Sequence, residues 1–250
     1  MKCFVVSLKN SDRRKDFDHR FKIFNYQFFD AITECTSNQF NSAIAKSIYG
    51  RCLRKGEIGC SLSHFNIIRD FALNSKENWL LIMEDDAVPE SQFIHFINEF
   101  ENKYVTTNAE VILLGHSKTS RKHIFVQRLK QPLRNYKNIN GISFGENKNV
   151  TLCGTVAYLI NKQAANIISG NSQPYWLADD WFLFQNMGIR VYHPQIPLVY
   201  EDLSYDSSTE NDIYYHHNFI KEPLKNIIHI IIGQYKFWND SRKLRKSNNK

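Results

Sequence analysis

The sequence contains no long apolar run. None of its apolar stretches approaches the roughly 20 residues that a membrane-spanning helix requires. The first residues, "MKCFVVSLKNSDRR", include an apolar stretch of about five residues, whereas the core of a signal peptide has roughly 7–15. We therefore expect neither a transmembrane anchor nor a signal peptide, and we expect a cytoplasmic protein.

Cysteine is scarce and is not arranged in pairs. The chain has 5 cysteines and no CxxC spacing. An odd number without close pairs argues against a disulfide framework and against a thiolate zinc site, and it is consistent with a reducing compartment. The cysteines are Cys3, Cys35, Cys52, Cys60 and Cys153.

Excess positive charge is also missing from most of the chain. The net charge is +7, but residues 221–250 hold eight Lys or Arg against two Asp or Glu. The first 220 residues hold 24 basic and 23 acidic side chains. A nucleic-acid-binding domain is expected to carry a basic surface on its folded body, so we expect no nucleic-acid partner.

What the chain does contain is enough apolar material for one large domain. Hydrophobic residues make up 42% of the 250 residues and charged residues 23%, which is typical of a globular protein. We assign residues 1–220 to this domain and residues 221–250 to a separate basic tail.

The tail has apolar residues at helical spacing, followed by basic residues. Such an amphipathic helix either docks on the core or lies on an anionic membrane surface, and both remain open. The apolar residues are Leu224, Ile227, Ile228, Ile231, Ile232, Tyr235 and Trp238.

Short β-branched runs alternate with helical patterns along the domain. Strands are predicted at residues 2–8, 26–32, 79–83, 110–115 and 151–160, with helices between several of them. A helix ending at Gly50 is predicted after the second strand, and a glycine-containing loop before a helix over residues 62–72. This alternation predicts an α/β fold with an at least partly parallel sheet.

Residues 116–149 interrupt the alternation. They are polar and basic, and we interpret them as an excursion from the core with a hairpin around "HIFVQRL" (residues 123–129). The basic side chains are Lys118, Arg121, Lys122, Arg128, Lys130, Arg134 and Lys137.

Three consecutive carboxylates follow the strand "WLLIM": Glu84, Asp85 and Asp86. Ligands of open α/β sheets bind at the carboxyl ends of strands. Because side chains alternate along a strand, Glu84 and Asp86 are expected on one side, where they could hold a divalent cation. The alternative is that Asp85 and Asp86 cap the next helix.

A second candidate is "RKGEIGCSLSHF", with Gly56 and Gly59 predicted just before a helix. Glycines let the backbone approach a ligand, and a helix N-terminus favours an anion such as a diphosphate. Arg54 and Lys55 would add positive charge. For His64, a packed, hydrogen-bonded position is the alternative to a functional one.

The third candidate is "YWLADDWFLF", where Asp179 and Asp180 lie between aromatic residues. These aspartates are either N-cap residues of a helix or include a desolvated general base for a substrate hydroxyl. Aromatic rings beside a carboxylate also suit stacking on a sugar.

Together these segments resemble glycosyltransferase family 25, a family of bacterial lipooligosaccharide galactosyltransferases. The resemblance covers roughly residues 2–200, with the segments in the order of the family. They are "FVVSLKNSDRR", "FFDAI", "GEIGCSLSH", "LIMEDDAVP", "GTVAYLINKQAA", "DDWFLF" and "VYHPQIPLVYE".

The resemblance implies a GT-A-like fold, in which a mixed, mostly parallel sheet is flanked by helices. It implies a UDP-sugar donor, with UDP-galactose favoured, and a β-linkage formed with inversion on a lipooligosaccharide acceptor. It also implies Mn²⁺ or Mg²⁺ as cofactor, and a position at the inner face of the bacterial inner membrane, where the tail would bind the anionic surface.

Carried over to this sequence, the resemblance gives each motif a role. Asp86 is the expected metal ligand, with Glu84 as a second, and the third protein ligand is left open among residues such as His193, His216 and His217. Asp180 is the expected base, with Asp179 as the alternative, and Tyr175, Trp176 and Trp181 lie on the acceptor side. The donor-binding residues are Ser7, Leu8, Arg13, Asp30, Arg54, Gly56, Glu57, His64, Glu84 and Asp85.

Two other functions stay open. A metal-dependent sugar nucleotidyltransferase also needs carboxylates at strand ends, but it has no need for an aspartate between aromatic residues. A non-enzymatic membrane- or nucleic-acid-binding protein would need positive charge across its whole body.

Overall fold

The computed structural model describes residues 1–22, 24–36, 38–117, 119, 121–147, 152–204 and 223–248. The side chains of residues 123 and 240–248 are left out of the description. His216, His217 and the first two residues of the predicted tail lie outside the described residues.

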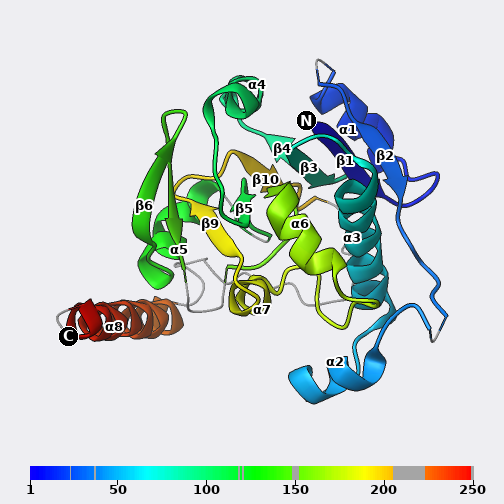
Figure 1. The fold of residues 1–250 in the computed structure, drawn as a ribbon. Helices are drawn as coiled ribbons and strands as arrows, with labels where there is room; N and C mark the ends of the chain where they lie inside the picture. The colour runs from blue at the N-terminus through cyan, green and yellow to red at the C-terminus, as the bar shows by residue number, and fades with distance from the viewer. Residues whose placement is uncertain are drawn as a thin grey trace.

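The domain is a three-layer sandwich with helices on both faces of one sheet (Figure 1). The sheet has 8 strands in the order β2-β1-β3-β8-β5-β9-β7-β6. The strands are β1 (Lys2–Ser7), β2 (Gln27–Asp30), β3 (Trp79–Glu84), β5 (Glu110–Leu113), β6 (Arg134–Ile139), β7 (Ile142–Glu146), β8 (Ala157–Asn161) and β9 (Arg190–Pro194).

The sheet is mixed, and only β8 and β7 run against the other described strands. This confirms the predicted α/β class with a mixed, mostly parallel sheet. Strand β8 lies antiparallel between β3 and β5. Its start is therefore at the edge where β3 and β5 end, and the residues just before β8 reach that edge.

Alternating side chains of the central strands feed two cores. Cys3, Leu81 and Met83 face one side, which is covered by α1 (Arg13–Arg20) and α4 (Phe93–Lys103). Val6, Leu80 and Ile82 face the other side, which is covered by α3 (Lys55–Asn74), α6 (Lys162–Ser169) and α7 (Trp181–Asn186). A strand that is buried on both faces has a continuous apolar sequence, and this is why the five residues "WLLIM" of β3 are all apolar.

Helix α3 begins earlier than predicted. It starts at Lys55, so Gly56 and Gly59 are inside the helix and not in a loop before it. A Cβ on Gly59 would lie 2.1 Å from the carbonyl oxygen of Ile32. The glycine therefore allows the helix to pack against the chain after β2, and the expected approach of this backbone to a ligand is wrong at Gly59.

The predicted hairpin in residues 116–149 is misplaced. "HIFVQRL" belongs to η1 (Arg121–His123) and α5 (Ile124–Lys130), and the hairpin is β6–β7. Asn140 and Gly141 have φ values of 48° and 81° at its turn, the positive values that an Asn-Gly hairpin turn adopts. Strand β7 pairs with β9, so this region extends the sheet and is not an excursion from it.

The smaller elements follow the sequence more closely. Helix α2 (Ser42–Tyr49) ends at Gly50, which is left-handed with φ 66°, as predicted. Strands β4 (Ala87–Pro89) and β10 (Val199–Glu201) form a separate antiparallel pair beside the end of β3.

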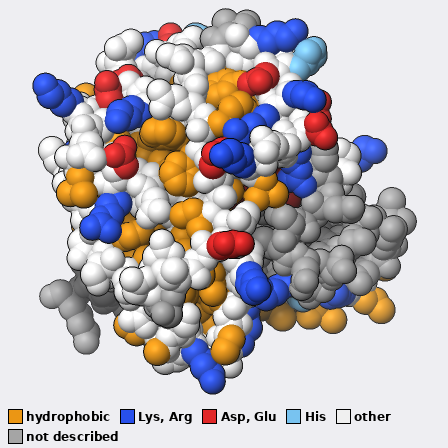
Figure 2. All heavy atoms as spheres, turned by 90° about the vertical axis from the view of Figure 1, so that its right-hand side faces the viewer, with side chains coloured by type: hydrophobic (Ala, Val, Ile, Leu, Met, Phe, Trp, Pro, Cys, Tyr) orange, Lys and Arg blue, Asp and Glu red, His pale blue; other side chains and the backbone are white. Residues whose placement is uncertain are grey.

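The tail forms α8 (Pro223–Asn248), which packs beside α5 on the opposite side of the molecule from α1 and β2 (Figure 1). No described helix has both the length and the apolar character needed to cross a bilayer. On the face shown in Figure 2, Lys and Arg side chains are interspersed with Asp and Glu, in line with the near-neutral charge of the body.

Candidate functional site

The three carboxylates lie where β3 ends. Glu84 is the last residue of β3, and Asp85 and Asp86 form the turn into β4. The segment after the turn is a strand, and the next helix, α4, has Gln92 at its N-cap. The alternative in which the aspartates cap the next helix is therefore wrong.

Arg13, at the start of α1, draws two of the carboxylates together. Its Nη1 lies 3.5 Å from Asp85 Oδ1 and 3.7 Å from Asp86 Oδ2. Ser7, at the end of β1, donates from its hydroxyl to Asp85 Oδ2 at 2.7 Å. Strand alternation predicts Glu84 and Asp86 on one side, but the strand ends at Glu84. Asp85 and Asp86 therefore lie in a turn, and both approach Arg13.

Arg14 is a member of this site that the sequence analysis did not identify. Its Nε donates to Ser7 Oγ at 3.2 Å and its Nη2 to the Ser7 carbonyl at 3.1 Å. It also forms an ion pair with Asp30 at the end of β2. The signal for Arg14 in the sequence is "DRR", because both arginines lie in the first turn of α1, beside the ends of β1 and β2.

Asp86 has a buried carboxylate oxygen, Oδ1, that no described residue of the protein hydrogen-bonds. Burial and the neighbouring charges of Glu84, Glu201 and Asp85 raise the pKa of Asp86 well above its usual range. A buried carboxylate oxygen without a partner among other carboxylates fits a divalent cation with oxygen ligands.

Glu84 is engaged on the α3 side. Its Oε1 accepts a hydrogen bond from the Thr155 hydroxyl, just before β8, and lies 3.7 Å from Nε2 of His64 on α3. Burial would raise the pKa of Glu84, but His64 and the Thr155 hydroxyl outweigh it, so the pKa is lowered. Thr155 reaches this edge because β8 is antiparallel to β3.

The two aspartates before α7 have different surroundings. Asp180 is the N-cap, accepting from the Leu183 N–H at 3.0 Å, and its other oxygen accepts from the Tyr49 hydroxyl at 2.6 Å. Asp179 accepts from the Gly154 N–H at 2.8 Å. Burial raises the pKa of Asp179, and the nearby charge of Glu84 raises it further.

The aromatic residues around these aspartates are mostly core residues. Trp176 and Trp181 are 2% and 4% exposed. Trp176 packs edge-on against Phe65 and Phe184, and the Trp181 indole donates to the Gly154 carbonyl. Both rings are enclosed and offer no free face to a sugar, so the expected stacking there is wrong, whereas Tyr175 is partly exposed.

The start of α3 is occupied by its own ion pairs. Both carboxylate oxygens of Glu57 accept from the Arg51 guanidinium at 2.8 Å, and the Arg54 N–H donates to Glu57 at 2.7 Å. Arg54 and Gly56 are exposed, as is Leu8 after β1. Glu57 thus stabilises the first turn of α3, and its charge would oppose an anion there.

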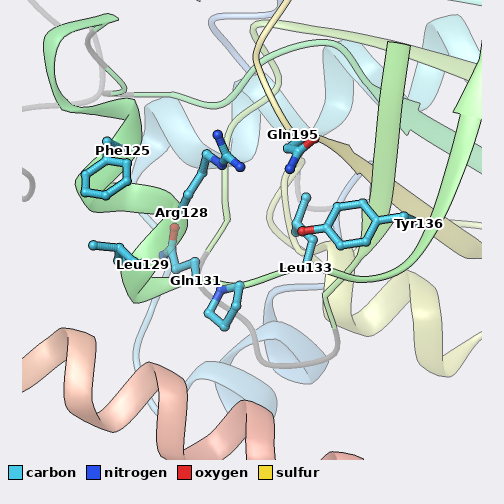
Figure 3. Close-up of a pocket in the computed structure, with 8 residues that line it drawn as sticks. Phe125, Arg128, Leu129, Gln131, Leu133, Tyr136 and Gln195 are labelled. Atoms are coloured by element: carbon cyan, nitrogen blue, oxygen red, sulfur yellow. The ribbon is translucent and has the colours of Figure 1, made fainter. Parts of the chain in front are cut away.

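A small hollow lies between α5 and the β6–β7 hairpin. In Figure 3 the Arg128 side chain points toward Gln195, with the rings of Phe125 and Tyr136 on opposite sides. None of the predicted catalytic, donor or metal residues lines it. The carboxylates at the end of β3 therefore define the candidate site.

A model of one protein family matches residues 1–183, and its description is "Glycosyltransferase family 25 (LPS biosynthesis protein)". The chain belongs to glycosyltransferase family 25. The match confirms the family resemblance found in the sequence.

Among relatives of this family 25 protein is the lipooligosaccharide biosynthesis protein lex-1 of Haemophilus influenzae, 28% identical over 199 residues. That alignment covers 66% of this chain and 61% of the relative. The curated relatives that the chain matches are covered over 31% to 61% of their own length.

Solved structures with a similar arrangement have low sequence identity. A197 from STIV is 16% identical with a TM-score of 0.40, covering 80% of this chain and 83% of that chain. The galactosyltransferase LgtC, in complex with donor and acceptor sugar analogs, is 11% identical with a TM-score of 0.34, covering 76% and 73%.

Proposed function

We propose that this family 25 protein is an inverting, metal-dependent glycosyltransferase. It moves galactose from UDP-galactose to a sugar of a lipooligosaccharide acceptor and forms a β-linkage. The observation that carries the proposal is the buried, unpartnered Asp86 Oδ1 at the end of β3, together with membership of the family.

The donor binds along the ends of β1, β2 and β3. Asp86 holds Mn²⁺ or Mg²⁺, which supplies positive charge to the diphosphate of the leaving group. Arg13 adds a guanidinium beside Asp85 and Asp86, and a guanidinium is also a strong donor to phosphate oxygens. Ser7 and Asp30 lie at the neighbouring strand ends and face the nucleoside.

Asp179 serves as the general base. Burial and the nearby charge of Glu84 raise the pKa of Asp179, and a carboxylate with a raised pKa is a better proton acceptor. It removes the proton of the acceptor hydroxyl as that oxygen attacks the anomeric carbon. Asp180, with both oxygens engaged by Leu183 and Tyr49, holds the start of α7 and so positions Asp179.

The tail places the enzyme on the inner face of the bacterial inner membrane. Helix α8 seats on α5 through Gly233, whose Cβ position is 1.9 Å from the Lys130 carbonyl oxygen, and through Gln234, which donates to the Leu129 carbonyl. Its apolar stripe remains exposed, including Leu224 at 75% and Ile231 at 61%. Exposed apolar residues next to basic ones suit an anionic bilayer surface.

Thermal unfolding with UDP-galactose and Mn²⁺ tests the cation and the donor together. Ligand at about 100 times its Kd stabilises a fold by about 2.7 kcal/mol, which is roughly 5–10 °C in Tm for a protein of this size. We expect this shift in the wild type and its loss in Asp86→Asn. Asp12→Asn, which removes an exposed carboxylate that precedes Arg13 in the sequence, is the matched control.

An undiminished Mn²⁺-dependent shift in Asp86→Asn would show that the cation lies elsewhere. A shift produced equally by nucleoside triphosphates and sugar phosphates, with release of pyrophosphate, would favour the nucleotidyltransferase.

A further inference from the structure

Three side chains of different chemistry meet beside the carboxylates. Cys60 and His64 are one turn apart on the same face of α3, and Glu84 ends β3. Their ligand atoms, a sulfur, a ring nitrogen and a carboxylate oxygen, all lie within 4.8 Å of one another. Cys60 and His64 are four residues apart, so their side chains are neighbours on the helix surface, and Glu84 comes from a separate strand.

His64 is oriented for a ligand on its Nε2. The side chain is 2% exposed, and its Nδ1 is 2.9 Å from the Tyr158 hydroxyl. Nε2 makes no hydrogen bond and lies 3.7 Å from Glu84. When Nδ1–H donates to Tyr158, the lone pair of Nε2 points into the space shared with Cys60 and Glu84, as in histidines that bind metals.

The other two groups complete a donor set. Glu84 Oε1 accepts a hydrogen bond from the Thr155 hydroxyl, which orients this carboxylate beside His64. Cys60 is half-buried, and its sulfur lies within 4.8 Å of the ligand atoms of His64 and Glu84. An unpartnered buried nitrogen aimed at a carboxylate and a thiol is costly unless something binds it.

We propose that Cys60, His64 and Glu84 bind a borderline transition-metal ion of the Zn²⁺ class. One thiolate, one imidazole and one carboxylate, with a fourth position open to water, is a donor set that such ions prefer. Mn²⁺ and Mg²⁺ prefer oxygen ligands alone, so this site is distinct in its chemistry from the one at Asp86. On binding, the thiol proton leaves to solvent and a sulfur–metal bond forms.

The ion would tie the N-terminal half of α3 to the end of β3. It would fix Glu84 and, through the adjacent turn, the positions of Asp85 and Asp86. The site does not depend on glycosyl transfer, so it can be tested without a nucleotide sugar.

The test is a Co²⁺ titration of the metal-free, full-length protein. Co²⁺ replaces Zn²⁺ at such sites, and a thiolate ligand produces a sulfur-to-cobalt charge-transfer absorption. We expect this absorption at one equivalent in the wild type and its loss in Cys60→Ser. Tyr158→Phe keeps all three ligands but removes the partner of His64, and it should bind roughly 10–100-fold more weakly.

Cys52→Ser removes an exposed cysteine just before α3 and is the matched control, with binding unchanged. Cooperative thermal unfolding of each variant shows that it is folded. If Cys60→Ser does not fold, weaker Co²⁺ binding by Tyr158→Phe still tests the proposal. Absence of the absorption in the wild type, or the same absorption in folded Cys60→Ser, would overturn the proposal. Added Zn²⁺ should abolish the absorption by competition.

Discussion

Asp179 and Asp180 are adjacent and chemically identical, yet they face different partners. The carboxylate of Asp180 is engaged by a helix N–H and by Tyr49, whereas Asp179 accepts from the Gly154 N–H and lies near the charge of Glu84. The sequence predicted either N-cap aspartates or a desolvated base here, and the family resemblance favoured Asp180 as the base. It could not assign them, because the assignment depends on Gly154 and Tyr49, which come from distant segments.

We expect Asp179→Asn to lower kcat by roughly 10²–10⁴-fold, the usual contribution of a general base. Asp180→Asn keeps an oxygen for the Leu183 N–H and should retain most of the activity. The measurement is UDP release from UDP-galactose with a lipooligosaccharide acceptor. Stabilisation by UDP-galactose with Mn²⁺ should be the same in Asp179→Asn and wild type, and an unchanged kcat in Asp179→Asn would exclude it as the base.

Asp86 should destabilise the fold at neutral pH when no cation is bound. Its pKa is higher in the folded protein than in the unfolded chain, so the fold favours the protonated carboxyl. The stability that this proton contributes is present in acid and is lost as pH rises through the folded-state pKa. Asp86→Asn is neutral at every pH and should therefore be more stable than wild type near pH 7.

Urea unfolding at two pH values measures this effect. Asp86→Asn should have a higher free energy of unfolding than the wild type, and this difference should shrink as pH falls below the folded-state pKa of Asp86. Near pH 7, Mn²⁺ should also reduce the difference, because it stabilises the wild type. A variant less stable than the wild type near pH 7 in the absence of metal ions would contradict the electrostatic explanation.

At the scale of elements, helix α8 has two different surfaces: one packs against α5, and the other exposes apolar side chains. The sequence predicted the helix and its apolar residues but left open which surface would meet the core. In the structure, Gly233 and Gln234 contact α5, because a residue without a side chain lets the two backbones approach. The larger apolar side chains consequently point outward.

We expect Ile228→Ser/Ile231→Ser to weaken binding to anionic vesicles by at least about tenfold, since burying a side chain of this size contributes roughly 1.5–3 kcal/mol. Vesicle co-sedimentation provides the measurement, with zwitterionic vesicles for comparison. Leu73→Ser/Val105→Ser, at exposed apolar positions outside α8, is the matched control. Equal binding by both double variants would refute a membrane role for the stripe.

Helix α3 and the β6–β7 hairpin show what local patterns can and cannot indicate. The glycines of "KGEIG" predict a loop before the helix, where the backbone could approach a ligand, but Gly59 lies inside α3 and packs against Ile32. The Asn140-Gly141 turn was present in the sequence as a hairpin signal. The apolar residues of "HIFVQRL" favour a strand as readily as a helix over so short a run, and in the structure residues 124–129 of that run lie in α5.

For the whole molecule, the sequence predicted the class of fold but not the order of strands. Apolar runs identify β1, β3, β5 and β8, since β3, β5 and β8 are buried on both faces and β1 is buried over most of its length. Nothing local in "AYLIN" shows that β8 runs antiparallel between β3 and β5. That placement brings Gly154 and Thr155 to Asp179 and Glu84, which is why these two site residues were missed.

The pairing of β3 with β8 also has a consequence for folding during synthesis, because the two strands are far apart in the chain. The apolar strand β3 is complete at Glu84, but its neighbour β8 ends only at Asn161. At about 5–20 residues per second, the edge of β3 would remain unpaired for roughly 4–15 s. An unpaired apolar edge is a template for aggregation, so nascent chains of this protein should depend on chaperones until β8 has been synthesised.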